Sequence, residues 1–191
     1  MAKFVSYKNY FLIAAPNMLD PTFARTVVFL CEHTESGAMG IVINRTMALS
    51  VANLLQRLDI ESHLETLHSQ WLYDGGPVQM ERGFVLHSPK QIFHSTLQVS
   101  DRVMLSTSRD VLEAIGRGES MPEKFLVSLG YSGWSAGQLE DELAANGWLL
   151  APADESIIFD IAAPKRYEAA LSLLGITDSG LDGWTKETGH A

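Results

Sequence analysis

The chain has 191 residues, of which 46% are hydrophobic and 19% charged, and its formal net charge is −9. This is the composition of an ordinary globular protein, and the length suits one well-filled core. The negative charge disfavours loose association with nucleic acid or anionic membranes, because both attract cations.

Apolar runs bounded by turn signals predict short strands in the first half of the chain. These runs are residues 11–15, 26–31, 38–44, 71–73 and 84–87. A polar connection that ends in Gly37 joins the second and third runs, which predicts an antiparallel hairpin. A helix follows the hairpin, because Ser50 is a good N-cap residue and Leu54 and Leu58 recur at helical spacing after it.

The second half of the chain predicts further strands and helices. Residues 97–105 predict a strand interrupted at 100–101, and the apolar run 125–129 predicts a central strand covered on both faces. Ser108 can cap a helix that ends near Gly118. Two more strands are expected at 148–150 and 157–159, and a last helix is expected between Pro164 and Gly175.

The stretch 130–140 is rich in glycine and predicts a tight turn into a third helix at Ser135. Ser135 and Gln138 fit the capping box, and the acidic residues that follow suit the positive end of a helix dipole but discourage a phosphate ligand. Two interpretations stay open. The glycines admit a ligand to the helix N-terminus, or they let the turn pack closely on a strand while Trp134 covers the core. We favour the second.

The familiar catalytic and metal-binding patterns do not fit the chain. The stretch 130–134 differs from the nucleophile elbow, because Trp134 stands where that motif needs glycine, so Ser132 is rejected as a nucleophile. Cys31 and His33 share one face of a predicted strand, but we expect Cys31 to be a buried small hydrophobic residue and His33 to lie at the turn. The histidines lack metal-ligand spacing, so neither a metal site nor a cofactor is expected.

The cysteine usage and apolar runs indicate the compartment. Cys31 is the one cysteine and cannot form an internal disulfide. The first ten residues do not resemble a secretory signal, and the longest apolar runs are far shorter than the roughly 20 residues that span a bilayer. We therefore expect a cytoplasmic protein that does not associate with membranes.

The order of the predicted elements indicates the fold class. Strands and helices mix without a regular βαβ repeat, and hairpin signals are frequent. This favours an α+β fold with a mixed, mostly antiparallel sheet flanked by about four helices. We find neither a linker nor an internal repeat, which predicts a single domain over residues 1–191, with a polar, frayed tail after about residue 178.

Four segments are distinctive in their order and spacing: residues 37–45, 75–78, 83–87 and 130–140. Together with the opening stretch 11–25 they resemble the YqgE/AlgH family of bacterial proteins, and the resemblance covers nearly the whole chain. It implies a single-domain α+β fold whose irregular sheet is bent into a pseudo-barrel. It implies no agreed active site, although one branch of the family has been called a transcriptional regulator of exopolysaccharide production.

Our leading hypothesis is a non-enzymatic cytoplasmic protein that binds a small molecule or a protein partner. Homo-oligomerisation is left open. The binding site would lie where three loops converge, at residues 44–45, 75–76 and 130–138. No residue is assigned a catalytic role. The candidate ligand-binding residues are Asn44, Arg45, Gly75, Gly76, His87, Ser132, Trp134, Gln138 and Glu140.

Two other functions stay open. The first is a hydrolase or transferase with a site near the 130–140 loop, in which His87, Ser132 or Glu140 acts as acid, base or hydrogen-bond donor. The second is a regulator of transcription that acts through a protein partner. Direct binding to nucleic acid is not expected, because the chain is acidic and shows no helix-turn-helix motif or basic patch.

Overall fold

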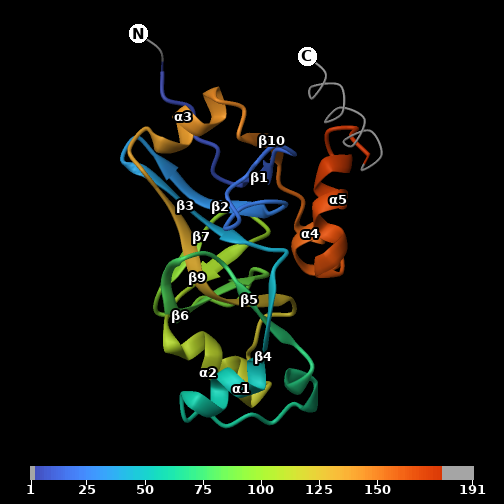
Figure 1. Ribbon diagram of the computed structural model, residues 1–191. Helices are drawn as coiled ribbons and strands as arrows, with labels where there is room; N and C mark the ends of the chain where they lie inside the picture. Colours follow the sequence, from blue (N-terminus) through green and yellow to red (C-terminus); the bar gives the residue numbers. More distant parts are fainter. Residues whose placement is uncertain (1–2, 178–191) are drawn as a thin grey trace. The chain divides into compact units, whose positions relative to one another are not determined.

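The computed structural model describes residues 3–177, which form two compact units (Figure 1). Unit 1 contains the described residues up to Asn44 and those from Ser132 onward, and unit 2 contains Arg45–Tyr131. The predicted frayed tail after residue 178 lies outside the described residues, and the single domain over residues 1–191 stays a prediction. No helix within residues 3–177 has the length and apolar character needed to cross a membrane.

Unit 1 is an antiparallel sheet that carries helices. Its strands follow the order β10-β1-β2-β3-β9, and each neighbouring pair is antiparallel. These strands are β1 (Tyr10–Ala14), β2 (Val27–Thr34), β3 (Gly37–Val42), the end of β9 (Phe125–Ser135) and β10 (Trp148–Pro152). The helices are α3 (Gln138–Ala144), α4 (Glu155–Phe159), η2 (Ala163–Lys165) and α5 (Arg166–Ser172).

The core of unit 1 lies around its central strands. Phe11 and Phe29 face each other on β1 and β2 and are fully buried, and α5 contacts both strands. Two side chains of α5 also make hydrogen bonds to the backbone near the ends of strands. The Tyr167 hydroxyl donates to the carbonyl of Ala14 at 2.6 Å, and the Arg166 guanidinium donates to the carbonyl of Ile43 at 2.6 Å. Polar contacts therefore fix the position of α5 on this sheet.

Unit 2 combines a mixed sheet with helices packed on it. Its strands are β4 (Thr46–Ser50), β5 (Trp71–Asp74), β6 (Val78–His87), β7 (Thr96–Gln98), β8 (Met104–Ser106) and the first part of β9, and its helices are α1 (Val51–Arg57), η1 (Glu65–His68) and α2 (Arg109–Arg117). Strand β9 pairs with β6 antiparallel and with β5 parallel. The core includes Leu55 from α1, Ile115 from α2 and Val127 from β9.

The predicted α+β class with a mostly antiparallel sheet is confirmed. The hairpin over residues 26–44 is β2 and β3, and the strand interrupted at 100–101 is β7 and β8. The helices predicted after Ser50 and Ser108 are α1 and α2. We expected about four helices, and residues 3–177 contain five α-helices.

The strand predicted at 157–159 is wrong, because these residues lie in α4. The Asp154 carboxylate accepts a hydrogen bond from the Ser156 backbone N–H at 3.0 Å and so caps the start of this helix. Within this helix, the side chains of Ile157 and Ile158 are buried. A short apolar run does not distinguish a buried strand from a buried helical turn, and here the cap decides.

The turn predicted at residues 130–134 is also wrong, because β9 continues to Ser135 and α3 begins at Gln138. Gly137, with φ at 81°, is the N-cap residue in place of Ser135. Only one half of the predicted capping box forms: the Gln138 side-chain oxygen accepts from the Ser135 backbone N–H at 3.0 Å. The Ser135 hydroxyl donates to the same oxygen instead of accepting from the helix backbone.

Candidate functional site

Unit 1 contains a cavity of about 240 Å³ beside three aromatic side chains, which we call the aromatic pocket. Phe23 comes from the connection between β1 and β2, Trp134 from the end of β9 and Trp148 from the start of β10. The complete lining is Met18, Asp20, Phe23, Gly133, Trp134, Gln138, Glu142, Ala145, Gly147 and Trp148.

The three rings of the aromatic pocket contact one another. The centroids of Trp134 and Trp148 are 6.2 Å apart, and those of Phe23 and Trp148 are 5.5 Å apart, both edge to face. Phe23 stacks on Trp134 at 6.1 Å. These are favourable aromatic geometries. Because β9 and β10 lie at opposite ends of the strand order in unit 1, the contact shows that this sheet curls until its two ends meet.

One carboxylate orients both indoles. Glu142 Oε1 accepts the indole N–H of Trp134 at 3.0 Å and that of Trp148 at 2.9 Å. Its other oxygen accepts from the Gln138 side-chain amide at 2.9 Å. Gln138 and Glu142 lie one turn apart on α3, so the helix presents both side chains on one face. The pocket wall is therefore preorganised by α3.

The charge of the aromatic pocket is negative. Asp20 and Glu142 contribute carboxylates, and the lining contains no Lys, Arg or His. Asp20 is exposed, and its Oδ1 accepts the Thr22 backbone N–H at 2.9 Å. The rest of the surface is mainly ring, methyl and backbone. The arrangement therefore suits binding of a small, partly apolar molecule and offers no nucleophile paired with a base.

A second polar pair in unit 1 joins β2 to α3. His33 Nδ1 accepts the Tyr7 backbone N–H at 2.8 Å, so the ring carries its proton on Nε2 and donates it to Glu140 Oε1 at 2.5 Å. The expectation that His33 lies at the turn is wrong, because it is a buried residue of β2 and its ring packs against Phe4 and Tyr7. Both ring nitrogens are used within the fold.

His87 occupies a buried network in unit 2. Its Nδ1 donates to the Ser88 carbonyl at 2.8 Å, and its Nε2 accepts from the Ser106 hydroxyl at 2.7 Å. Burial lowers the pKa of His87, and the Ser88 carbonyl partly opposes this effect. A serine beside a histidine resembles a nucleophile with its base. Both side chains are completely buried, however, so this pair is closed to a substrate in the structure.

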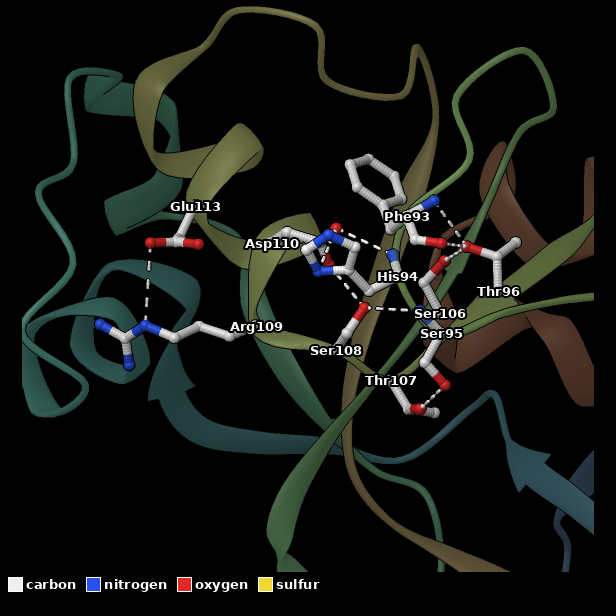
Figure 2. Close-up of polar contacts among 10 residues, drawn as sticks. All are labelled: Phe93, His94, Ser95, Thr96, Ser106, Thr107, Ser108, Arg109, Asp110 and Glu113. Carbon is white, nitrogen blue, oxygen red and sulfur yellow. Dashed lines mark hydrogen bonds and ion pairs between the residues drawn. The ribbon is translucent and has the colours of Figure 1, made fainter.

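The N-terminus of α2 is tied to the loop before β7 by a cluster of hydroxyl and carboxylate groups (Figure 2). Asp110 accepts hydrogen bonds from the Ser108 hydroxyl at 2.5 Å and from the His94 backbone N–H at 2.9 Å. Burial alone would raise the pKa of Asp110, but these hydrogen bonds outweigh it and lower the pKa. The cluster holds the loop in place. Ser108 is the N-cap residue of α2, but its side chain makes no capping hydrogen bond to the helix backbone.

The structure brings Gly75, Gly76 and Gly130 together within unit 2. The Gly75 N–H donates to the Leu129 carbonyl at 3.0 Å, and a side chain at Gly130 would collide with the carbonyl oxygen of Gly76. Gly130 has φ at 77°, so both its conformation and its surroundings require glycine. These glycines therefore serve close packing of backbone on backbone.

Asn44 and Arg45 lie at the point where the chain passes from unit 1 to unit 2. The Asn44 amide accepts from the Val27 backbone N–H and donates to the Arg25 carbonyl, both at 2.9 Å, so it closes the end of the β2 and β3 hairpin. Arg45 is half-buried, and its carbonyl accepts from the Asp74 N–H at 2.9 Å. The amide of Asn44 is thus engaged within the fold.

The remaining candidates divide between different environments. Trp134 and Gln138 line the aromatic pocket, whereas Ser132 is fully buried in β9 opposite Gly40. Glu140 pairs with His33, and His87 with Ser106. The sequence interpretation missed the other lining residues of the pocket, which include Asp20, Phe23, Glu142 and Trp148. The one available signal was the helical spacing of Gln138 and Glu142.

Cys31 is a buried hydrophobic residue, as predicted. Burial raises the pKa of its thiol far above the usual range, which removes the thiolate that a nucleophile needs. Within residues 3–177, no group of three or more His, Cys, Asp or Glu side chains is arranged to hold a metal ion.

Comparison with known protein families matches the AlgH-like family model to residues 11–179, which is most of the chain. Curated relatives are similar along nearly their full length. A UPF0301 protein of Thiobacillus denitrificans is 52% identical over 187 residues, covering 98% of each chain. The UPF0301 protein RSc0675 of Ralstonia nicotianae is 50% identical over 187 residues, covering 98% of this chain and 96% of the relative.

Two solved structures share the fold. The solution structure of the AlgH protein PA0405 from Pseudomonas aeruginosa matches with a TM-score of 0.80 and 48% identity, covering 95% of this chain and 97% of that one. The crystal structure of DIP2367 from Corynebacterium diphtheriae matches with a TM-score of 0.64 over 82% and 81% of the two chains. Its 22% identity supports a likeness of fold alone.

Proposed function

The chain belongs to the AlgH-like family, and we propose that it is a non-enzymatic binding protein that holds a small molecule in the aromatic pocket. The observation that carries the proposal is the pair of hydrogen bonds from Trp134 and Trp148 to Glu142. Ligand sites are usually preformed, mostly apolar hollows with a few fixed polar groups. The aromatic pocket has this character.

The titratable groups in the structure support binding over chemistry. His33 and Glu140 bond to each other, and His33 also accepts from Tyr7. His87 and Ser106 are completely buried. A general base must reach the proton that it removes, either directly or through one water. Each of these groups instead has a clear part in holding strands, helices or the N-terminal segment together.

The volume of the aromatic pocket limits the size of the ligand. Sites for drug-sized molecules are typically about 300–1,000 Å³, and this pocket measures about 240 Å³. The ligand is therefore a small metabolite or the head group of a larger molecule. We place this activity in the cytoplasm, since the single thiol of Cys31 gives no use for an oxidising compartment. Any regulatory role would be indirect, through a partner that responds to the liganded protein.

A thermal-shift screen against a metabolite library tests the proposal. A ligand present at 100 times its dissociation constant should raise the free energy of unfolding by about 2.7 kcal/mol and the melting temperature accordingly. Each compound that raises the melting temperature is then tested on Ala145→Leu, which adds bulk to the pocket wall and leaves Trp134, Trp148 and Glu142 in place. The matched control is Ala144→Leu, an exposed position on the same helix outside the lining.

We expect Ala145→Leu to abolish the shift and Ala144→Leu to retain it. A compound that stabilises both variants equally binds elsewhere and contradicts the proposed site. If no library member stabilises the wild-type protein, the binding function itself is contradicted.

A further inference from the structure

We infer that the ligand of the aromatic pocket carries a quaternary or methylated ammonium group. This inference rests on the proposed function and adds the chemical class of the ligand. Asp20 and Glu142 place two carboxylates in a lining that has no Lys, Arg or His. A phosphate or carboxylate ligand would meet like charges there, and these are repulsive within a partly desolvated site.

The aromatic side chains supply the second element of the inference. Phe23, Trp134 and Trp148 are three π systems around one small cavity. The negative face of an aromatic ring attracts a cation, most strongly for Trp, and clusters of such rings recognise choline and methylated lysine. A neutral apolar ligand would use the rings but leave the two carboxylates without a counter-charge.

The hydrogen bonding of Glu142 selects among cations. An ionised carboxylate has about four acceptor positions, and Trp134, Trp148 and Gln138 occupy three of those on Glu142. A primary ammonium has three N–H donors. Beside the two indoles it would find one open acceptor position on Glu142, since the Asp20 carboxylate is exposed to solvent. A methylated ammonium needs few acceptors and presents methyl groups to the rings. The pocket therefore fits a diffuse cation better than a compact, strongly hydrated one.

Choline and its neutral isostere 3,3-dimethyl-1-butanol form the matched probes. Binding is followed by tryptophan fluorescence in a Trp71→Phe, Trp184→Phe background, in which Trp134 and Trp148 are the remaining tryptophans. We expect choline to bind about tenfold more tightly than the neutral isostere. A peptide with a trimethylated lysine, tested beside choline, distinguishes a protein side chain from a free metabolite as the source of this group.

Two single-charge variants test the electrostatic part. Asp20→Asn removes one charge of the pocket and keeps the oxygen that accepts from Thr22. Asp59→Asn is the control, because it removes one exposed charge in unit 2 at a positive φ that asparagine tolerates. We expect Asp20→Asn to weaken choline binding about threefold or more, Asp59→Asn to leave it unchanged, and added salt to weaken it.

The inference is supported if either cationic probe binds more tightly than the neutral isostere and if Asp20→Asn reduces this preference. Equal binding of choline and the isostere overturns the ammonium class and leaves the pocket as a binding site. Failure of both cationic probes to bind at millimolar concentration also overturns it. The proposed function has its own test: it is contradicted if the library screen finds no compound that stabilises the wild-type protein but not Ala145→Leu.

Discussion

Trp134 and Trp148 lie on strands at opposite ends of the strand order in unit 1, yet both direct their indole N–H groups at the same oxygen atom. That atom belongs to Glu142 on α3, a helix that contacts both β3 and β10. One carboxylate thus links the two ends of a curled sheet and shapes the wall of the aromatic pocket. A residue of this kind serves the fold and the site together.

Replacing Glu142 with alanine should destabilise the protein strongly. The change leaves two nearly buried indole N–H groups without an acceptor, since Trp134 and Trp148 are 6% and 4% exposed. We expect the free energy of unfolding to fall by about 2–4 kcal/mol in urea denaturation. Asp141→Ala is the control, because Asp141 is exposed on the same helix and should lose less than about 1 kcal/mol. Equal losses would show that Glu142 does not hold the indoles.

His33→Ala should loosen the attachment of the N-terminal segment, residues 3–9, to β2. The substitution removes the acceptor of the Tyr7 N–H and the ring on which Phe4 and Tyr7 pack. We expect a loss of about 2–3 kcal/mol and faster trypsin cleavage after Lys8, measured by mass spectrometry. His63→Ala is the control at an exposed histidine. An unchanged cleavage rate in His33→Ala would mean that the segment is anchored by other contacts.

His87 should make the stability of the protein fall in mild acid. Burial lowers the pKa of His87 below its ordinary 6.5, so the folded state binds a proton less readily than the unfolded state. The stability that His87 contributes is complete above about pH 6.5 and is lost as the pH falls through that value toward the folded pKa. His87→Gln keeps a polar group that can reach Ser106 but does not titrate.

The measurement is the urea midpoint of the wild type and of His87→Gln between pH 5 and 8. We expect the difference in unfolding free energy between the two proteins to shrink as the pH falls below about 6.5. A difference that is constant across this range would contradict the account of His87.

Local sequence signals predicted much of the fold. Ser50 marked the start of α1 because its capping box is local: its partner Asn53 is three positions along the chain and accepts from the Ser50 N–H. The β2 and β3 hairpin was predicted because its partners are close in the chain. The course of residues 130–135 was not predicted. The glycines suggested a turn, whereas pairing with β3 and β6 extends the strand. That pairing depends on residues far away in the sequence.

The candidate site was predicted only in part, for the same reason. Trp134 and Gln138 were named because they lie in a distinctive segment. Trp148 and Phe23 join them through the pairing of β10 with β1 and through the loop after β1, and no local pattern records these contacts. The segment 130–140 thus supplies part of the pocket lining, namely Gly133, Trp134 and Gln138. The other lining residues lie elsewhere in the chain.

Substitutions at two glycines separate backbone conformation from close packing. Gly130 and Gly137 have φ at 77° and 81°, but a side chain at Gly130 meets the Gly76 carbonyl, whereas nothing lies within 4 Å of one at Gly137. We expect Gly137→Ala to lose about 1–2 kcal/mol from conformation alone. Gly130→Ala should lose clearly more, measured by urea denaturation. Similar losses at both positions would contradict the close approach of residues 76 and 130.

The indole N–H resonances of Trp134 and Trp148 test directly whether a ligand binds in the aromatic pocket. Both groups point at Glu142 in the wall of the aromatic pocket, whereas Trp71 is about half exposed in unit 2. The four indole signals are assigned by single Trp→Phe substitutions in the ¹⁵N-labelled protein, which is then titrated with a ligand from the thermal-shift screen. Our account predicts that the signals of Trp134 and Trp148 shift together and saturate with one dissociation constant, while that of Trp71 stays fixed. A saturating ligand that moves neither signal would contradict it.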